Sequence, residues 1–537
     1  MSEQTLELKN LTIVYTLSKE EVFTAVKGAS LSIARGSTLA LVGESGSGKS
    51  TLAAAVNLLL PANGTTESGE ILLEGSAIHD LSQPEMRSKR GRHIGLVPQD
   101  PMSNLDPMMT VGRQIAEALT AHGKSASEAK DRALELLDMV GIPDPADRYG
   151  QYPHEFSGGM RQRVLIAMGM ACKPKLLIAD EPTSALDVTV QRKVLDQLEQ
   201  MAREMGTAVL LITHDIALAA ERADHIAVMY RGELVEVGRS SEVMNSPQHE
   251  YTKRLLNAAP SLHDASLVPP KDFAQAETII AAADLHKTYK LRSSKGTTRH
   301  VHALRGVTFD IKRGTTVSLV GESGSGKSTA ANILLGLENP NGGEIGFEGR
   351  PLDLSSQRKS MAFRRQVQPV FQNPFASLDP RFSVFQSIVE PLKVHKTGTA
   401  KEQAARAAEL MDAVSLPQAL LARLPHELSG GQRQRVAIAR ALALSPSVIV
   451  LDEAVSALDV VVQKQILDLL VTLQSELDLS YLFISHDLAV VRMISHFVHV
   501  MKSGEIVESG TPQELFENPQ TDYTKQLLGA IPNPKKR

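Results

Sequence analysis

Short apolar runs of strand length recur along this chain, and several of them end at a glycine or an acidic residue. The segments 37–43 and 315–321 end at glycine, whereas 175–180 and 447–452 end at aspartate. Runs of this kind are typical of buried strands. Helix-forming sequence follows the glycines, as in STLAAAVNLLL at 50–60. Because strands and helices alternate, the pattern predicts an α/β fold with a parallel sheet.

Two longer stretches depart from this alternation. Between about 112 and 156, and again between about 385 and 428, the apolar spacing is mostly helical. Each stretch lies between a strand that ends at glycine and a strand that ends at aspartate. The pattern therefore predicts a helical subdomain inserted into the sheet core at both places.

The second half of the chain repeats the first. GESGSGKST occurs at 43–51 and, identical at all nine positions, at 321–329. Later segments match as well, for example 156–163 with 428–435, and the offset drifts by only six residues over the repeat. Self-similarity of this length indicates two copies of one domain.

The predicted boundary lies where this pattern is lost. The segment 263–277 contains two prolines, mixed charges and no clear period, which favours a linker. A flexible segment of that length spans about 20 Å. We therefore predict a first domain at 1–260, a linker at 261–277 and a second domain at 278–537.

Composition excludes several classes of protein. Of the 537 residues 42% are hydrophobic and 22% charged, with a net charge of −4, which argues against disordered or collagen-like chains and against non-specific binding of nucleic acid. The single cysteine, Cys172, excludes a disulfide framework, a zinc ribbon and a cysteine-ligated iron–sulfur cluster. The N-terminus has no signal-peptide pattern, and no apolar stretch is long enough for a spanning helix. We expect a cytosolic chain that reaches a membrane only by docking to a partner.

The repeated glycine-rich segment matches the pattern GxxxxGK[ST]. Its glycines let backbone N–H groups surround phosphates, the helix that follows adds its positive N-terminal dipole, the lysine neutralises the outer phosphates and the hydroxyl binds Mg²⁺. Both copies lie between a predicted strand and a predicted helix, which argues against a chance glycine-rich turn. The predicted nucleotide-binding residues are Gly43, Glu44, Ser45, Gly46, Ser47, Gly48, Lys49, Ser50 and Thr51, with Gly321, Glu322, Ser323, Gly324, Ser325, Gly326, Lys327, Ser328 and Thr329.

Two acidic residues follow four apolar ones at Asp180-Glu181 and again at Asp452-Glu453. A strand that ends in two acids is often only the start of a solvated loop. Here the pair occurs in both copies, on the strand expected to face the phosphate-binding loop. We expect the aspartate, with Ser50 or Ser328, to hold Mg²⁺ and the glutamate to polarise the attacking water.

A third repeated motif carries a resemblance to a known family. Ser157-Gly158-Gly159 and Ser429-Gly430-Gly431, each before an arginine-rich helix start, resemble the signature of ABC-type ATPases, and the likeness covers nearly all of both halves. The resemblance implies two tandem P-loop ATPase domains, each with a mixed-sheet core and an inserted helical subdomain. In that family the signature completes the ATP site of the opposite domain. The resemblance further implies a glutamine that contacts metal and water at Gln99 and Gln372, a switch histidine at His214 and His486, a D-loop at 184–187 and 456–459, and an adenine-stacking tyrosine at Tyr15 and Tyr289.

Ordinary structural roles compete with some of these assignments. A lone tyrosine near a strand is more often packing, and an isolated histidine at a strand end is usually structural. Each histidine here follows a buried strand and precedes an aspartate, Asp215 or Asp487, as the family pattern requires. The resemblance therefore favours the functional role for the histidines, and less strongly for the tyrosines.

The likeness extends to a subfamily. Segments 99–115 and 372–388, and the tails with EYTKRLL and DYTKQLL, resemble ATPases of dipeptide, oligopeptide and nickel importers. A chain that carries both halves is similar to the fused ATPases of microcin C and related peptide importers. Met160 replaces the usual glutamine of the signature, and Ala454-Val455 replaces Pro-Thr. No group that handles phosphate, Mg²⁺ or water is lost, so we expect both sites to hydrolyse ATP, though unequal rates stay open.

This resemblance implies an importer ATPase at the cytoplasmic face of the inner membrane. It implies ATP and Mg²⁺ as cofactors, two transmembrane permeases as partners, and a substrate-binding protein outside. A tandem ABC protein of translation would carry a long charged linker and excess basic charge, and a chromosome ATPase would carry zinc cysteines or a long coiled coil. The sequence shows neither set of features. The solute stays open among peptides, nickel, glutathione and opine-like compounds.

Overall fold

The computed structural model divides into two compact units. Their main bodies are Met1–Ala259 and Pro260–Leu458 with Val462–Ile531. The predicted boundaries at 260 and 278 stay a prediction. The structure describes residues 4–18, 21–183, 186–260, 265–292, 298–353, 357–372, 377–456 and 458–532.

A six-stranded sheet forms the centre of the first unit. Its strand order is β10-β9-β3-β8-β7-β6, and all neighbouring strands are parallel except β9 and β10. The predicted α/β fold with a mixed sheet is thereby confirmed. The strands are β3 (Thr38–Val42), β6 (Ile94–Val97), β7 (Leu176–Asp180), β8 (Ala208–Thr213), β9 (His225–Tyr230) and β10 (Glu233–Arg239).

A second, antiparallel sheet packs on one face of the first. Its order is β2-β1-β4-β5, and its apolar residues join those of β7 and β8 in one core cluster. Along β7, Ile178 lies in this cluster, whereas the adjacent Leu177 lies in the cluster on the other face. The sheet is therefore covered on both sides. The strands are β1 (Gln4–Thr16), β2 (Val22–Ala34), β4 (Gly64–Leu73) and β5 (Ser76–Ala77).

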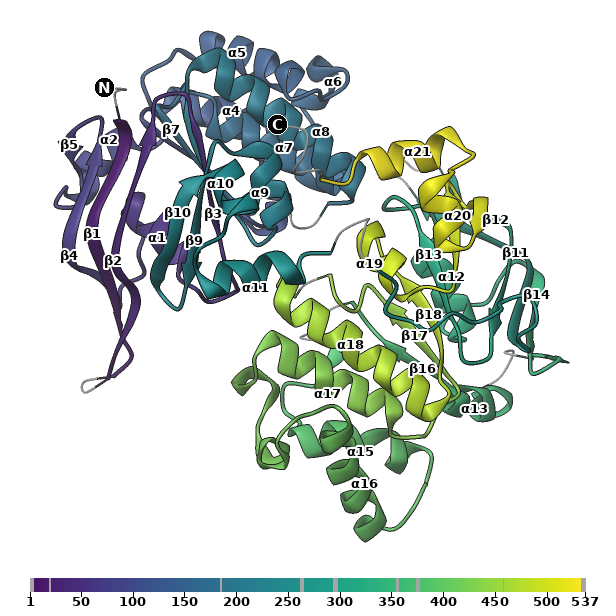
Figure 1. The fold of residues 1–537 in the computed structure, drawn as a ribbon. Helices are drawn as coiled ribbons and strands as arrows, with labels where there is room; N and C mark the ends of the chain where they lie inside the picture. Colours follow the sequence, from purple (N-terminus) through teal and green to yellow (C-terminus); the bar gives the residue numbers. More distant parts are fainter. Residues whose placement is uncertain are drawn as a thin grey trace. The chain divides into compact units, whose positions relative to one another are not determined.

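The predicted helical stretch lies on the opposite side of the large sheet. Helices α4 to α7 gather there, away from the antiparallel sheet (Figure 1). Helix α5 starts at a capping box, in which Ser125 accepts from the Glu128 amide and Glu128 accepts from the Ser125 amide. The helices of this unit are α1 (Lys49–Val56), α2 (Gln83–Lys89), α3 (Pro101–Asn104), α4 (Val111–Thr120), α5 (Ala126–Met139), α6 (Pro145–Tyr149), α7 (Gly158–Gly169), α8 (Val188–Met205), α9 (Ile216–Arg222), α10 (Ser240–Asn245) and α11 (Glu250–Ala258).

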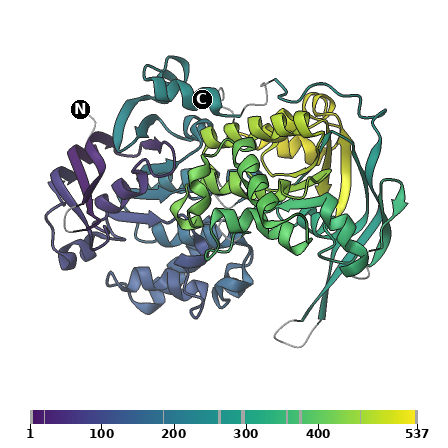
Figure 2. The same ribbon diagram turned by 90° about the horizontal axis from the view of Figure 1, so that it is seen from below.

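The second unit repeats this architecture strand for strand. Its large sheet has the order β16-β17-β18-β13-β19-β20, and its antiparallel sheet β12-β11-β14-β15. Strands β11 and β12 form a long hairpin that projects from this unit (Figure 2). The strands are β11 (Thr278–Arg292), β12 (Thr298–Lys312), β13 (Thr316–Val320), β14 (Gly342–Phe347), β15 (Arg350–Pro351), β16 (Val367–Val370), β17 (Val448–Asp452), β18 (Ser480–Ile484), β19 (Phe497–Lys502) and β20 (Glu505–Gly510).

Helices of the second unit follow the same plan as those of the first. Those of its helical region, α15 to α17, pack with the large sheet in one apolar cluster. The helices are α12 (Lys327–Leu334), α13 (Gln357–Gln366), α15 (Val384–Val394), α16 (Ala400–Ala413), α17 (Gly430–Leu442), α18 (Val460–Leu477), α19 (Leu488–Ile494), α20 (Pro512–Glu517) and α21 (Asp522–Gly529).

The connecting segment, residues 265–277, lies against the second unit. The Leu267 amide donates to the Met493 carbonyl at 2.7 Å, and Val268 is buried in the core of this unit. Phe273 stacks on Phe497, with ring centroids 4.5 Å apart. The connector is therefore a packed part of the second unit, although its sequence has neither the period of a helix nor that of a strand.

Candidate nucleotide site of each half

The phosphate-binding loop of the first half curls around its own lysine. The loop joins β3 to α1 at the carboxyl edge of the parallel strands, where ligands of such sheets bind. Lys49 is buried, and its Nζ donates to the carbonyls of Gly43 and Glu44, both at 2.8 Å. Gly48 has a φ of 107°, and a Cβ there would lie 2.6 Å from the Ala25 carbonyl oxygen. A bulkier residue would therefore collide with β2 and strain the loop.

The loop of the second half has the same geometry. Lys327 is buried and donates to the carbonyls of Gly321 and Glu322, at 2.7 and 2.8 Å. Gly326 has a φ of 108°, and a Cβ there would lie 2.5 Å from the Ala303 carbonyl oxygen. The identical sequences thus fold alike in two different surroundings.

Burial lowers the pKa of Lys49, while the nearby charges of Glu181 and Asp180 act in the opposite direction. The negative charge of a phosphate would stabilise the protonated form of this lysine. The loop is therefore suited to an anionic ligand.

The acidic pair lies beside this loop. The Ser50 hydroxyl donates to Asp180 Oδ1 over 3.5 Å. Gln99 donates from Nε2 to Glu181 Oε2 at 2.8 Å, and His214 Nδ1 lies 3.2 Å from Glu181 Oε1. These five predicted residues therefore converge at the ends of neighbouring strands β3, β6, β7 and β8.

The acidic pair of the second half is held in the same way. Gln372 Nε2 donates to Glu453 Oε2 at 2.6 Å, and His486 Nδ1 lies 3.4 Å from the same oxygen. Burial raises the pKa of Asp452, and a hydrogen bond from the Ser328 side chain opposes part of this rise. The glutamine, histidine, serine and acidic pair of each half thus form one cluster.

The two acids of each pair differ in electrostatic surroundings. Burial raises the pKa of Asp180. Burial acts the same way on Glu181, but the hydrogen bond and charge of His214 outweigh it and lower the pKa of Glu181. The pKa of His214 is raised, because the hydrogen bond and charge of Glu181 outweigh the effect of burial. Glu181 and His214 therefore hold each other in their charged forms, and Glu453 and His486 do the same.

The catalytic candidates sit on a strained backbone, which sequence reasoning missed. Glu181 has a φ of 43° and Glu453 a φ of 48°, the left-handed region that costs free energy for any residue with a Cβ. The Glu181 amide donates to the Ile212 carbonyl at 2.9 Å, and the Glu453 amide makes the matching bond to Ile484. The neighbouring strand thus holds each glutamate in this conformation. An acidic residue just beyond a buried strand was the only available signal.

The signature motif forms the start of a helix in each half. Ser157 is the N-cap of α7 and accepts from the Met160 amide at 3.3 Å, as Ser429 accepts from Gln432 in α17. A Cβ on Gly159 would lie 2.4 Å from Val190 Cγ1 of α8, whereas one on Gly158 would meet nothing closer than 3.9 Å. The second glycine of the motif therefore has a packing role of its own, and the first does not.

The D-loop residues are only partly described. Ser184 and Ala185, and Ala457 in the second half, lie outside the described residues. Asp187 is the N-cap of α8 and accepts from the Val190 amide at 3.0 Å. The Ser456 hydroxyl donates to the Glu453 carbonyl at 3.0 Å. The described residues of the motif thus contact the acidic pair at Glu453 and cap the following helix α8 at Asp187.

The two candidate adenine-stacking tyrosines differ in their contacts. The Tyr15 hydroxyl lies 3.2 Å from Thr51 Oγ1, at the start of α1. The Tyr289 hydroxyl donates instead to Glu338. The Tyr15 hydroxyl therefore lies beside a residue of its own predicted nucleotide-binding segment, and the stacking role of both tyrosines stays a prediction.

The donor set beside each loop fits a metal that arrives with a nucleotide. Within the described ranges there is no group of three or more His, Cys, Asp or Glu that could hold a metal ion by itself. Each loop instead offers one hydroxyl and one carboxylate, Ser50 with Asp180 and Ser328 with Asp452. Mg²⁺ commonly takes one or two protein oxygens and completes its shell with phosphate oxygens and water.

Family comparisons agree with this geometry. The model of the ABC transporter family matches residues 26–184 and 304–456. A second model, for the C-terminal region of oligopeptide/dipeptide transporters, matches 235–283 and 507–537. In the part of the chain that the structure covers, no helix has the length and apolar character to cross a bilayer.

Curated relatives match almost end to end. The glutathione import ATP-binding proteins GsiA of Shigella sonnei (strain Ss046) and Escherichia coli (strain K12) are each 46% identical over 98% of this chain and 89% of their own length. Among solved structures, cbiO1 of Clostridium perfringens is 33% identical, covers 45% of this chain and 92% of its own, and has a TM-score of 0.40. The ADP- and phosphate-bound cassette MJ0796 is 32% identical, covers 44% and 98%, and has a TM-score of 0.40.

The repeated phosphate-binding loops, paired acids and inserted helices define an ATPase with two nucleotide-binding domains on one chain. The chain belongs to the ABC transporter family, and its two halves are two ATP-binding cassettes. Its tail regions carry the C-terminal region typical of oligopeptide and dipeptide transporters. The predicted family, fold and ATPase class are thereby confirmed.

Proposed function

We propose that this chain is the ATP-hydrolysing subunit of an importer that takes up peptides or similar small solutes, glutathione among them. The single observation that carries the hydrolytic part is the cluster around Glu181, repeated at Glu453. In each half a charged glutamate is fixed by a glutamine and a histidine beside the phosphate-binding loop. Import is supported by the relatives named for glutathione import and by the matching tail regions.

The reaction is attack of water on the γ-phosphate of ATP, which gives ADP and phosphate. Lys49 and Lys327 hold the phosphates, and Ser50 with Asp180, like Ser328 with Asp452, would hold the Mg²⁺ that arrives with the nucleotide. Glu181 and Glu453 accept a hydrogen bond or the proton from the attacking water. His214 and His486 keep these carboxylates charged and oriented. Gln99 donates to the other oxygen of Glu181, whereas Gln372 and His486 both contact Oε2 of Glu453. Mg²⁺, when bound with the nucleotide, neutralises charge on the phosphate oxygens.

Each ATP site is completed by the signature of the other half. The signature presents a serine at a helix N-terminus, where backbone N–H groups and the helix dipole attract an anion. Ser157 and Gly158 are exposed. We therefore assign Ser429, Gly430 and Gly431 to the nucleotide at Lys49, and Ser157, Gly158 and Gly159 to the nucleotide at Lys327.

Two membrane permeases dock near the segments that follow Gln99 and Gln372. In the first half, the side chains of Met102 and Met108 are 65% and 84% exposed, an apolar surface that suits a short helix of a partner. The corresponding Phe375 of the second half lies outside the described residues, whereas Phe382 is partly buried. We place the protein at the cytoplasmic face of the membrane, with a substrate-binding protein acting through the permeases.

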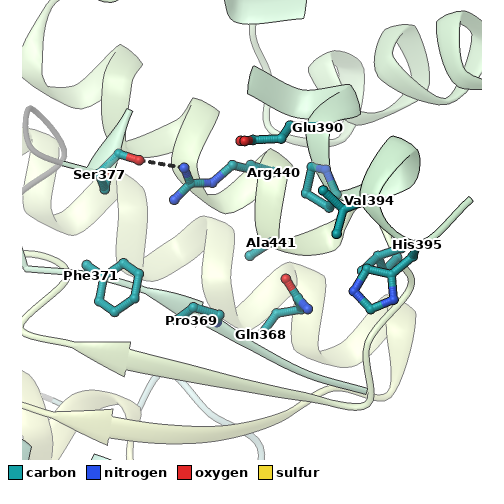
Figure 3. A pocket seen from close by; sticks show the side chains of 11 residues that line it. Gln368, Pro369, Phe371, Ser377, Glu390, Val394, His395, Arg440 and Ala441 are labelled. Atoms are coloured by element: carbon teal, nitrogen blue, oxygen red, sulfur yellow. Dashed lines mark hydrogen bonds between the residues drawn. The ribbon is translucent and has the colours of Figure 1, made fainter. Parts of the chain in front are cut away.

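A cavity of about 310 Å³ beside the second of these segments supports this docking site (Figure 3). Its walls come from β16, α15 and α17, and include Phe371, Val394 and Glu390. Arg440 donates from Nη1 to the Ser377 carbonyl at 2.5 Å on one side of it. The cavity thus lies between the helical region and the strand that leads to Gln372. A partner segment bound there would contact residues close to Gln372, which donates to Glu453.

The hydrolytic assignment is tested by replacing both glutamates. Glu181→Gln and Glu453→Gln keep the shape and the hydrogen bonds from Gln99 and Gln372 but remove the charge that acts on water. We expect the double variant to bind ATP and to lose at least about 100-fold in hydrolysis. Phosphate release and binding of a fluorescent ATP analogue measure the two properties. Wild-type hydrolysis by the double variant would overturn the assignment.

A further inference from the structure

The C-terminal helix of each half touches the phosphate-binding loop of the same half. In the first half, the hydroxyl of Tyr251 on α11 accepts a hydrogen bond from the Glu44 amide at 3.0 Å. In the second half, the hydroxyl of Tyr523 on α21 accepts from the Glu322 amide at 3.1 Å. Both tyrosines are buried, with 3% and 7% of their surface exposed. The contact therefore recurs where the two tails differ in sequence.

Different neighbours hold the two tyrosine rings in the same place. Tyr251 stacks on Tyr230 at the end of β9, with ring centroids 4.1 Å apart. Tyr523 lies under the ammonium of Lys502 at the end of β19, 4.7 Å from its ring centroid. Stacking in one half and a cation–π contact in the other thus lead to the same hydroxyl position. The shared element is the hydrogen bond to the loop.

A carboxylate on the last strand anchors each tail helix. In the second half, Glu508 of β20 accepts from the amides of Gln520 and Thr521 at 2.7 and 3.0 Å, and from the hydroxyls of Thr521 and Thr524. Partial burial raises its pKa, but these hydrogen bonds outweigh that effect and lower the pKa of Glu508 to about 2. Glu236 of β10 accepts from the corresponding amides of the first half. The tail is thus fixed one turn before the tyrosine.

The tyrosine and the lysine act on the same residue of the loop. The amide of Glu322 donates to Tyr523, and its carbonyl accepts from Lys327 at 2.8 Å. A bound phosphate draws the hydrogen-bonding capacity of the ammonium away from this carbonyl. The bond to Tyr523 then remains to hold Glu322 in place. A phenol is neutral at physiological pH, so its hydroxyl can accept from the amide. In the first half, burial raises the pKa of Tyr251 further.

We propose that Tyr251 and Tyr523 are positioning residues for nucleotide binding, through which the tail of each half fixes the shape of its own phosphate-binding loop. The inference rests on the proposed role of these loops in binding ATP. It assigns to the tail region a direct structural link to the nucleotide, in addition to any contact that the tail makes with other proteins.

The test uses the full chain and one matched pair of variants in the second half. Tyr523→Phe removes only the hydroxyl that accepts from Glu322. Tyr481→Phe removes another buried hydroxyl of the same unit, which donates to the Leu470 carbonyl at 2.9 Å. Both variants are made with Lys49→Ala, so that binding of a fluorescent ATP analogue reports on the second half.

We expect Tyr523→Phe to weaken binding of the analogue about 5- to 10-fold, because an unpaired buried amide is costly and the loop loses its fixed shape. Hydrogen–deuterium exchange of the peptide that contains Glu322 should be faster in the same variant. Tyr481→Phe should leave the affinity for the analogue and the exchange rate at the level of the Lys49→Ala parent, even where it lowers the thermal midpoint.

Two outcomes separate this inference from the proposed function. If Lys327→Ala abolishes binding but Tyr523→Phe binds like the parent or exchanges at the parent rate, the positioning role is wrong and the nucleotide site stands. If the two tyrosine variants lose affinity equally, the effect is general destabilisation and the inference is also wrong. If Lys327→Ala leaves binding unchanged, the assignment of the loop itself fails.

Discussion

At the residue scale, the glutamate of each acidic pair combines several features that cost free energy. Glu181 and Glu453 combine a left-handed backbone, a buried carboxylate and a histidine partner. The strain and the burial both oppose the native arrangement. They persist because the amide of each glutamate is bound by the neighbouring strand and its carboxylate by two side chains. The strain thus lies in the backbone of the residue whose carboxylate is proposed to act on water.

This arrangement predicts a shift in pH dependence when the histidines are removed. In the double variant His214→Ala and His486→Ala, burial remains and raises the pKa of both glutamates, while the hydrogen bond and charge of the histidine, the largest effects that lower it, are gone. A carboxyl with a raised pKa is protonated earlier as the pH falls. We therefore expect kcat/KM for ATP to fall by about 100-fold and its acid limb to move to higher pH.

A pH–rate profile of the double variant measures both effects. His225→Ala, a change at an exposed histidine at the start of β9, serves as the control and should retain the wild-type profile. An acid limb that stays at the wild-type pH in the double variant would show that the histidines do not keep the glutamates charged.

At the scale of elements, the two glycines of the signature motif differ in role: Gly159 packs against the next helix, whereas Gly158 does not. Gly159 is in close contact with Val190, whose branched side chain has little rotamer freedom in a helix. Gly159→Ala should therefore destabilise the packing of α7 on α8 by about 1–3 kcal/mol. Gly158→Ala should not lower the thermal midpoint, because the nearest atom to its added methyl is Leu186 Cδ2 at 3.9 Å, an ordinary van der Waals distance. Its effect on hydrolysis then reports on the nucleotide alone.

Thermal unfolding and ATPase assays distinguish these two glycines. Val190→Ala in the Gly159→Ala background removes the methyl group that the new Cβ would meet, so part of the lost stability should return. A Gly158→Ala variant that unfolds as early as Gly159→Ala would contradict the distinction. The corresponding pair in the second half is Gly430 and Gly431, with Val462 as the neighbour of the second glycine.

Sequence reasoning reached the elements that carry a regular pattern and missed those that do not. The parallel strands, the loops at Lys49 and Lys327 and the inserted helices follow from apolar runs and repeated glycines. The long strands β1 and β2 escaped, because register shifts, such as the one between Leu8 and Leu11, interrupt the two-residue alternation. The connector escaped for another reason. It packs through separate residues, Val268 and Phe273, and these do not produce the regular apolar spacing from which a helix or a strand is predicted.

The candidate site shows the same division. Repeated spacing identified the lysine, the acids, the glutamine and the histidine of each half, and the structure brings these together. The bonds from Tyr251 and Tyr523 to the loops join residues about two hundred positions apart. Such a pairing depends on how the tail folds back over the sheet, which local spacing cannot reveal. The roles of the signature residues depend on the partner half and stay predictions.

At the scale of the whole molecule, two cassettes on one chain allow the pairing of sites to be tested within a single molecule. Ser429→Arg puts a bulky cation where a small hydroxyl is proposed to meet the γ-phosphate bound at Lys49. Adding Lys49→Ala should cause little further loss, because both changes strike one site. Adding Lys327→Ala should abolish hydrolysis, because both sites are then lost. Changes within one unit are strongly non-additive.

Photolabelling of each half with an ATP analogue provides a second readout where coupling between the sites hides the difference in rate. In Ser429→Arg, labelling should fall in the first half and persist in the second. Labelling that is lost in the second half and kept in the first would contradict the proposed pairing.

The packed connector also bears on how such a chain can be taken apart and recombined. Val268 and Phe273 belong to the interior and ring stacks of the second unit, although they precede its first strand, β11. The segment of chain that folds as the second cassette therefore begins before its first strand. A gene fusion, a split or a transplant that moves the second cassette has to carry the connector with it. A junction at the first strand would separate a fold from part of its own core.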